Sequence, residues 1–383
     1  MISVPVNEPV IPAEARQYVL EALESGWVSS AGKFIQEFEE AFARYLGVKH
    51  AITATSGTAA LHLSLSALGI GPGDEVIVPD FTMIASAYAV LYTGASPVFV
   101  DCDPETFTLD VSQLEAKITP LTKAIMPVHI YGHAADMDPI LALARERKLS
   151  VVEDAAEAHG AEYKGRLCGT MGTVNAFSFY GNKIITTGEG GMVTTDDDAI
   201  AERVRSLKDL AHSPAKRFVH ESIGFNYRMT NLQAALGLGQ MKHIGEFLRK
   251  KQWMAQRYFD GLQDIAGLRL PVTKSWAKNV YWMYAVLVED SFGMTRDAFR
   301  AELKTRGIDT RDFFTSCAAQ PAIRALTPAP FGSAQGLRQS LRQGPFPVTE
   351  DIAERGLYLP SGLALTEEQI AAVIAAVHSI AHG

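Results

Sequence analysis

The chain has few cysteines, no long apolar run and no excess of basic residues. Its three cysteines, Cys102, Cys168 and Cys317, form no CxxC pair, which argues against a disulfide framework and against a zinc site. No segment approaches the roughly 18 uninterrupted apolar residues of a membrane span, and the N-terminus lacks the basic and apolar regions of a signal peptide. We therefore expect a protein of the reducing cytoplasm that does not bind a membrane and holds no metal.

The charge balance argues against a general nucleic-acid binder. The 383 residues include 35 Lys and Arg against 43 Asp and Glu, a net charge of −8, whereas affinity for a phosphate backbone needs a basic face. The apolar fraction of 47% and the charged fraction of 20% are ordinary for a folded globular chain. At roughly 150 residues per domain, the length corresponds to two or three domains.

Apolar strands and helical patterns alternate along the first 240 residues. Strands are expected at 50–55, 75–78, 97–100, within 121–132, at 149–154 and within 174–181. This alternation predicts an α/β fold with a mostly parallel sheet, covered by helices on both faces. The pattern changes near residue 240, where one long helix over 232–262 leads into a smaller α/β unit. We expect a large domain of residues 1–245 and a small C-terminal domain of residues 246–383.

Helical periodicity also marks both ends of the chain. A helix begins after Pro12. Its predicted apolar face consists of Val19, Leu20 and Leu23. Near the C-terminus, Thr366 and Gln369 have the spacing of a capping box ahead of an apolar stripe. We expect both helices to pack these faces against the core.

Three segments contain residues suited to binding or catalysis. Each follows a strand that ends at the carboxyl edge of the predicted sheet, where open α/β folds bind ligands. Ser56-Gly57-Thr58 begins a helix, so its N–H groups suit a phosphate, although plain helix capping explains the same residues. Glu153 and Asp154 end an apolar strand and either cap the next helix or pair with a buried cationic ring nitrogen. Lys183 precedes a Gly-rich turn; it is either a surface lysine or an amine whose pKa is lowered by burial, which makes it a nucleophile.

Five motifs occur in a fixed order along the chain. They are SGTAALHL, VPDFTMIASA, VEDAAEAHGA, FSFYGNKIITTGEGGMV and FNYRMTN. Together they resemble the DegT/DnrJ/EryC1/StrS family of sugar-nucleotide aminotransferases, from about residue 5 to the last helix. The resemblance implies the fold type I architecture, similar to aspartate aminotransferase, with pyridoxal 5'-phosphate as cofactor and its pyridoxamine form as intermediate.

The resemblance implies a role for each matched residue. Lys183 would bind the cofactor aldehyde covalently and move protons as base and acid, and Asp154 would pair with the ring nitrogen. Glu157 matches the position that contacts the ring hydroxyl, and Met83 matches a position where many relatives place an aromatic side chain over the ring. The residues implied for the phosphate are Ser56, Gly57, Thr58 and Ser178.

Further implied contacts concern a second subunit and the substrate. Asn231 resembles a residue that reaches the phosphate of the neighbouring subunit, which implies a homodimer with shared active sites. Lys33 and Arg228 are candidates for a substrate diphosphate, with ordinary surface positions as the alternative. The segment that faces the sugar in relatives reads RDFFTSCA here; its candidates are Phe313 and Ala318, and Ala318 stands where relatives have His.

The motifs GDEVIVPDFT, GASPVFVDCDPETF and LTKAIMPVHIYGH most resemble members that use a GDP-linked 4-keto-6-deoxy sugar. The implied reaction moves an amino group from a donor amino acid, glutamate, to the ketone and yields a 4-amino-4,6-dideoxy sugar nucleotide. The altered segment 311–318 leaves a UDP- or dTDP-linked keto sugar, or a keto-sugar acid, open as substrate. A non-catalytic ligand-sensing regulator with the same fold is the alternative from a different class.

Overall fold

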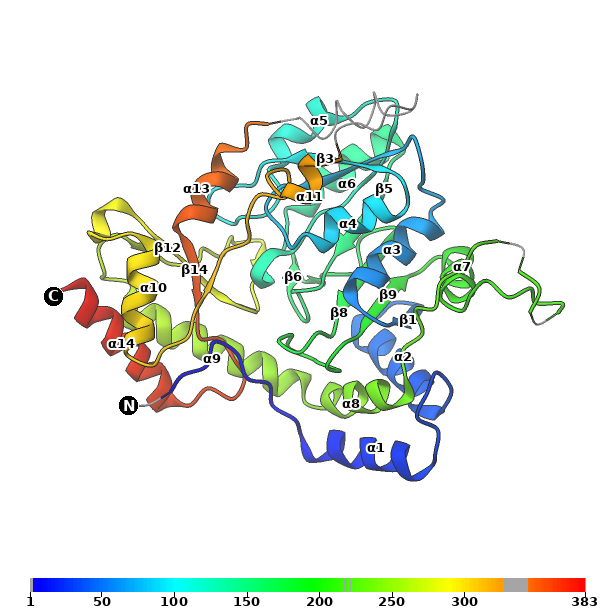
Figure 1. Cartoon of the computed structure of the whole chain (residues 1–383), viewed down its shortest axis with the longest axis horizontal. Coiled ribbons are helices and arrows are strands. Elements are labelled where there is room, and N and C mark those ends of the chain that lie inside the picture. The colour runs from blue at the N-terminus through cyan, green and yellow to red at the C-terminus, as the bar shows by residue number, and fades with distance from the viewer. Residues whose placement is uncertain (1–2, 217, 221, 327–343, 383) are drawn as a thin grey trace.

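A seven-stranded sheet lies at the centre of the computed structural model, which describes residues 3–216, 218–220, 222–326 and 344–382 (Figure 1). Its strands are β1 (His50–Ala54), β2 (Glu75–Pro79), β3 (Ser96–Val100), β4 (Thr122–Ile125), β5 (Ser150–Asp154), β8 (Val174–Ser178) and β9 (Gly191–Thr195). Their order is β1-β9-β8-β5-β4-β2-β3. Strand β9 is antiparallel to both of its neighbours, β1 and β8, so it runs opposite to the other six strands. The predicted mostly parallel sheet is confirmed, and β9 is a strand that the sequence pattern did not separate from the Gly-rich turn.

Alternate residues of the strands face opposite cores. In β2, Ile77 belongs to one core, whereas Val76 and Val78 belong to the other. The first core is covered by α2 (Lys33–Leu46), α6 (Met137–Arg147) and α8 (Asn231–Met241). The second is covered by α3 (Gly57–Ala67), α4 (Ala85–Tyr92) and α7 (Asp198–Lys208). Both faces of the sheet are therefore buried, which explains why its strands are continuous apolar runs.

The first helix, α1 (Ala13–Glu24), packs differently from the prediction. Leu20 and Leu23 are 57% and 51% exposed, whereas Ala15 and Ala22 are fully buried. A Cβ added at Gly239 of α8 would lie 2.3 Å from the Cα of Ala15. Small residues thus allow α1 and α8 to approach closely. Of the predicted apolar face, Val19 packs against the core, whereas Leu20 and Leu23 lie outside the core of their own chain.

The expected single helix over 232–262 is two helices, α8 and α9 (Ile244–Leu262). His243 interrupts them with a backbone outside the helical region (φ −107°, ψ 5°). Its ring lies 3.0 Å from a carboxylate oxygen of Glu14 in α1 and 3.3 Å from one of Glu246. The apolar period continues across this break, so the pattern alone did not reveal it.

A second, antiparallel sheet forms the C-terminal part. Its order is β10 (Leu268–Arg269), β12 (Tyr284–Val288), β14 (Gly356–Leu359) and β13 (Arg311–Asp312). It shares a third core with α9, α10 (Arg296–Thr305) and α14 (Glu367–Ala381). The predicted capping box of Thr366 and Gln369 is confirmed at the start of α14. Within the described ranges, no helix combines the length and apolarity that a membrane span requires.

The remaining elements are a small ribbon and a set of short helices. A three-stranded ribbon consists of β11 (Ala277–Lys278), β6 (Glu162–Tyr163) and β7 (Arg166–Leu167). The short helices are η1 (Val111–Gln113), α5 (Leu114–Lys117), η2 (Ile130–Gly132), η3 (Asp290–Phe292), α11 (Pro321–Arg324) and α13 (Pro347–Arg355).

Carboxylates at the carboxyl edge of the large sheet hold segments from the far end of the chain. After β2, Asp80 Oδ1 accepts a hydrogen bond from the backbone N–H of Ala318 (2.8 Å). After β3, Asp101 Oδ1 accepts one from the N–H of Thr349 in α13 (2.8 Å). The segment around Ala318 and the start of α13 therefore cover the sheet edge at which the candidate site residues are predicted.

Candidate active site

A phosphate-sized cradle forms where α3 begins. The Oγ atom of Ser56 accepts a hydrogen bond from the N–H of Ala59 (3.1 Å), and the N–H of Ala60 donates to the Ser56 carbonyl (3.0 Å). Gly57 and Thr58 are the first two residues of α3, so their N–H groups have no acceptor within the helix and face its open end. A Cβ added at Gly57 would lie 2.7 Å from the Cβ of Ser178 at the end of β8. Glycine thus lets a hydroxyl and a helix N-terminus converge, the arrangement that binds an anion.

Asp154, the last residue of β5, is buried beside β8. Its Oδ2 accepts a hydrogen bond from the hydroxyl of Ser86 (2.8 Å) and its Oδ1 one from the N–H of Ala156 (3.1 Å). Burial raises the pKa of this carboxyl, and the two hydrogen bonds oppose that rise. A buried carboxylate of this kind is stabilised by a cation, and a protonated ring nitrogen provides one.

Glu157 is buried one turn further along the chain. Its Oε2 accepts a hydrogen bond from the N–H of Tyr131 (2.8 Å), and its Oε1 lies 3.5 Å from Nζ of Lys183. Burial raises its pKa to about 7, although the Lys183 charge opposes the rise. Near neutral pH this carboxyl can therefore exchange a proton with a hydroxyl placed next to it.

Lys183 lies in the turn after β8, where its N–H donates to the carbonyl of Tyr180 (2.9 Å). Burial lowers the pKa of its amine, with Glu157 and Asp154 opposing the change. Its Nζ lies 3.5 Å from the centre of the Trp282 ring. A buried amine with a lowered pKa is the form of lysine that attacks carbonyl carbons.

These groups fit pyridoxal phosphate, each for a separate reason. The cradle at Gly57 suits its phosphate, the buried Asp154 its ring nitrogen, Glu157 its hydroxyl and Lys183 its aldehyde. Met83, the predicted ring contact, is 50% exposed and lies three residues before Ser86. Phe81, a neighbouring aromatic, is instead fully buried among other rings.

Asn231 has a different environment from the one expected. Its Oδ1 accepts a hydrogen bond from the N–H of Phe34 (3.0 Å), and its Nδ2 donates to the carbonyl of Trp27 (2.7 Å). Both polar atoms of the side chain are engaged within its own chain, where they join α8 to the link between α1 and α2. The Nδ2 amide carries a second hydrogen, so a contact with a partner's phosphate would not require breaking either bond, and that contact stays a prediction.

The two predicted diphosphate contacts lie outside the Lys183 cluster. Lys33 begins α2 and forms an ion pair with Glu21 of α1. Arg228 forms an ion pair with Asp209 (2.8 Å) and donates to the side-chain oxygen of Asn226 (3.1 Å). Their contact with a substrate stays a prediction.

The segment 311–318 reaches the cluster through one residue. Phe313 is 5% exposed, and its ring centre lies 5.0 Å from that of Tyr131, whose N–H is bonded to Glu157. The buried Phe313 ring therefore supports Tyr131, and its contact with the sugar stays a prediction. Ala318 is partly buried and is held through its backbone by Asp80.

Three contacts of the cluster were not predicted. Ser86 lies inside a quoted motif, VPDFTMIASA, so a hydroxyl near the site could have been noticed. Tyr131 has a left-handed backbone (φ 53°), unusual for a non-glycine residue and typical of functional sites, but no pattern indicates it. Trp282 comes from the segment just before β12 and meets Lys183 through tertiary structure alone.

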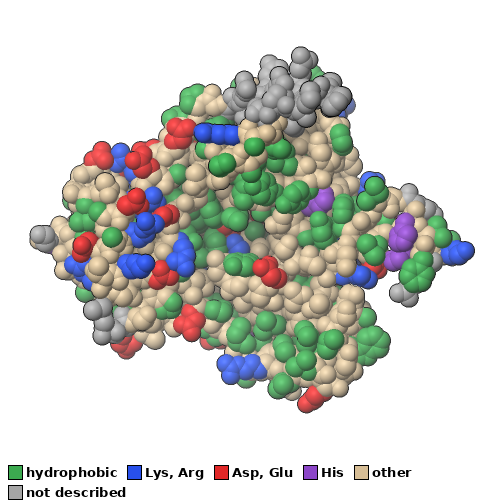
Figure 2. All heavy atoms as spheres, in the orientation of Figure 1, with side chains coloured by type: hydrophobic (Ala, Val, Ile, Leu, Met, Phe, Trp, Pro, Cys, Tyr) green, Lys and Arg blue, Asp and Glu red, His purple; other side chains and the backbone are tan. Residues whose placement is uncertain are grey.

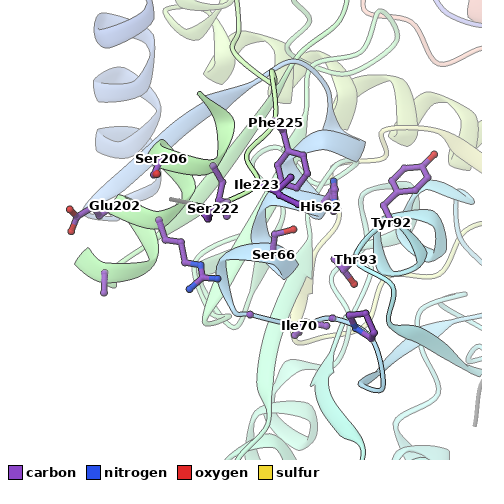
Figure 3. A pocket seen from close by; sticks show the side chains of 16 residues that line it. His62, Ser66, Ile70, Tyr92, Thr93, Glu202, Ser206, Ser222, Ile223 and Phe225 are labelled. Atoms are coloured by element: carbon purple, nitrogen blue, oxygen red, sulfur yellow. The ribbon is translucent and has the colours of Figure 1, made fainter. Parts of the chain in front are cut away.

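A separate pocket of about 730 Å³ opens at the other end of α3 (Figure 3). His62, Tyr92 and Phe225 are among the residues that line it. None of the predicted site residues lines this pocket, so the predicted chemistry belongs to the Lys183 cluster.

A buried lysine, two buried acids and an anion cradle at one sheet edge define a pyridoxal phosphate enzyme of the aminotransferase type. Residues 9–378 match the DegT/DnrJ/EryC1/StrS aminotransferase family, and the chain belongs to this family. The family is pyridoxal phosphate-dependent, so the family, fold class and cofactor expected from the sequence are confirmed.

Three similar proteins illustrate the match. GDP-perosamine synthase from Caulobacter vibrioides is 47% identical over 379 residues, which cover 98% of this chain and 97% of that protein. The crystal structure of S. venezuelae DesV in complex with a ketimine intermediate has a TM-score of 0.87 at 38% identity, covering 98% of this chain and all of that one. The putative sugar aminotransferase Spr1654 from Streptococcus pneumoniae, in its PLP form, has a TM-score of 0.89 at 25% identity, covering 99% of both chains.

We expect Gly57→Ala to weaken cofactor binding roughly ten- to hundredfold, because its Cβ would push α3 away from Ser178 and remove one or two charge-assisted hydrogen bonds. Absorbance titration of the cofactor-free protein measures this. Gly71→Ala is the matched control, since the nearest atom to a Cβ there lies at an ordinary 3.7 Å. Equal affinity in both variants would show that the phosphate binds elsewhere.

We expect Asp80 to make the protein less stable as the pH rises from about 4 to about 6. Burial raises the pKa of Asp80 from 3.8 to about 6, so in that window the folded state binds a proton that the unfolded state has lost. Asp80→Asn should remove up to about 3 kcal/mol of this decline, measured by urea unfolding across the window. In the exposed control Asp260→Asn the wild-type slope should remain; the same slope in Asp80→Asn would refute the assignment.

Proposed function

We propose that this protein transfers an amino group from glutamate to the C4 ketone of a GDP-linked 4-keto-6-deoxy sugar, forming a 4-amino-4,6-dideoxy sugar nucleotide of the GDP-perosamine type. The observation that carries the proposal is the burial of Lys183 next to Glu157, at the sheet edge that also holds Asp154. The substrate is supported by the nearly full-length similarity to GDP-perosamine synthase. The donor is the one that the sequence resemblance implies.

Each residue has one task in this proposal. When bound, pyridoxal phosphate supplies an aldehyde that takes up the donor's amino group and a ring that withdraws electrons from the neighbouring carbon. Asp154 keeps a proton at the ring nitrogen, and Glu157 holds the proton of the ring hydroxyl. Nζ of Lys183, while free, accepts a proton from one carbon and returns it to another. The residues that bind the phosphate are Ser56, Gly57, Thr58 and Ser178.

The alternative hypotheses about substrate and function become outcomes of the test. A UDP- or dTDP-linked ketone, or a keto-sugar acid, is an alternative substrate because segment 311–318 departs from the motif of relatives. The backbone of this segment is bonded to Asp80, so an altered side chain at Ala318 changes the pocket wall without changing the course of the chain. A regulator without catalysis has no need of both a buried Lys183 and a buried Asp154.

We infer further that the protein is a homodimer that works in a reducing compartment such as the cytoplasm. Hydrophobic side chains gather at the lower edge of the molecule, over α1 (Figure 2). Leu20, Leu23, Trp27 and Val28 are all exposed there. A contiguous apolar patch on a folded protein favours association. The cysteines Cys102, Cys168 and Cys317 are buried and unpaired, which suits a reducing compartment.

We retain the division into residues 1–245 and 246–383 as part of this proposal. It is supported by the position of the large sheet within 50–195 and of the second sheet within 268–359. Several links cross it: β11 pairs with β6, Val4 pairs with Ile308, and Asp80 and Asp101 accept hydrogen bonds from the C-terminal part.

The purified protein should convert GDP-4-keto-6-deoxy-mannose in the presence of glutamate, with equimolar 2-oxoglutarate released. Lys183→Ala should lose the absorbance of the lysine-bound cofactor and at least about a thousandfold of the rate, because no other amine replaces it. Lys164→Ala, at an exposed lysine paired with Asp138, is the control. Turnover of a UDP- or dTDP-linked ketone or a keto-sugar acid instead would refute the substrate; cofactor binding without any conversion by glutamate would favour the regulator.

Sedimentation velocity should show a dimer that the double variant Leu20→Glu, Leu23→Glu converts to monomer, because charges at these exposed positions oppose burial in an interface. Leu121→Glu, at another exposed leucine, is the control and should leave the dimer intact. A wild-type monomer at micromolar concentration would contradict the inference.

A further inference from the structure

A second lysine is buried next to the candidate active site. Lys251 of α9 is 2% exposed, and its Nζ donates hydrogen bonds to the carbonyl oxygens of Trp282 (2.8 Å) and Ser361. Among the residues that the structure describes, no carboxylate forms an ion pair with it, and burial lowers its pKa to about 7. Burial of a cation without an anion costs folding free energy. Here the two hydrogen bonds to backbone carbonyls offset part of this cost.

Trp282 is fixed at two points. Its backbone carbonyl accepts the hydrogen bond from Lys251, and its indole Nε1 donates to the carbonyl of Asn182 (2.8 Å), the residue before Lys183. The two lysines, Asn182 and Trp282 also line one cavity of only about 10 Å³. Trp282 is therefore held at its ring as well as at its backbone, and it is only 3% exposed.

The fixed indole presents its face to the reacting amine. Nζ of Lys183 lies 3.5 Å from the ring centre, and Oε1 of Glu157 lies 3.5 Å away. The indole face attracts a cation more strongly than other aromatic side chains do. The indole face and the Glu157 carboxylate both favour a protonated Lys183 and oppose the effect of burial, which lowers its pKa. Neither contact is a short hydrogen bond, so the amine stays able to leave.

We propose that the Trp282 face is the resting place of the Lys183 amine whenever this amine is not bonded to the cofactor, and that Lys251 is a positioning residue that holds Trp282 there. The proposal rests on the proposed function only in taking Lys183 as the reacting amine. A resting place of this kind keeps the free amine beside the carbons between which it moves protons. It also favours the protonated form that must deliver a proton.

The first test measures Lys183 in the cofactor-free protein. Reductive methylation at a series of pH values, followed by mass spectrometry of the peptide that contains Lys183, gives the pH at which the amine becomes reactive. Because the indole face stabilises the protonated form, Trp282→Leu should lower this midpoint by about one pH unit. Trp282→Phe keeps a ring and should lower it less. An unchanged midpoint in a folded Trp282→Leu protein would overturn the proposal.

The second test asks whether Lys251 acts through Trp282. Lys251→Met should lower the Lys183 midpoint in the native background and leave it unchanged in the Trp282→Leu background, because the residue it positions is then absent. Lys251→Arg keeps the donors and should restore part of the shift. Lys250→Met is the matched control, since Lys250 is the neighbouring lysine of α9 and contacts Trp253 instead. A shift of equal size in both backgrounds, or a rise, would mean that Lys251 acts by its charge and would overturn its positioning role.

A third measurement separates these roles from general stability. In the loaded enzyme, Trp282→Phe and Lys251→Arg should lower kcat with glutamate while KM for glutamate stays the same, because donor binding does not involve the resting amine. A rise in KM alone would contradict the proposal. The methylation assay contains neither donor nor sugar, so a wrong substrate assignment leaves its result untouched.

Discussion

The structure depends on keeping one amine out of water and next to two carboxyl groups. Lys183 is buried beside Glu157, and Asp154 lies at the end of the adjacent strand. Burial acts on these groups in opposite directions, because it lowers the pKa of the amine and raises the pKa of the acids. The charges partly compensate each other, so the cluster can hold protons without being locked into a single charged state.

The parallel sheet supplies the geometry that makes this burial possible. Each parallel strand ends at the same edge, so Asp80, Asp154 and Ser178 are brought to one side of the molecule although they are far apart in the chain. Asp80 and Asp101 then hold backbone segments of the C-terminal part over that edge. The closure of the site is therefore built from hydrogen bonds to carboxylates, given by backbone N–H groups and, at Asp101, also by the hydroxyl of Thr349.

The sequence alone determined the motif residues at strand ends, because an acid or a lysine directly after an apolar strand marks the edge of a sheet. Ser56, Gly57, Asp154 and Lys183 were found in this way and do lie at that edge, whereas Ser178 was implied by the resemblance to the family. Tertiary structure alone decided the contacts of Trp282, Lys251 and Tyr131, since no local pattern relates β12, α9 or η2 to the turn after β8. It also decided that Asn231 braces its own chain and that α1 exposes its leucines, because both depend on how closely α1, α2 and α8 can pack. Periodicity reports which residues are apolar, but only the packed structure shows against which surface, and in which molecule, they are buried.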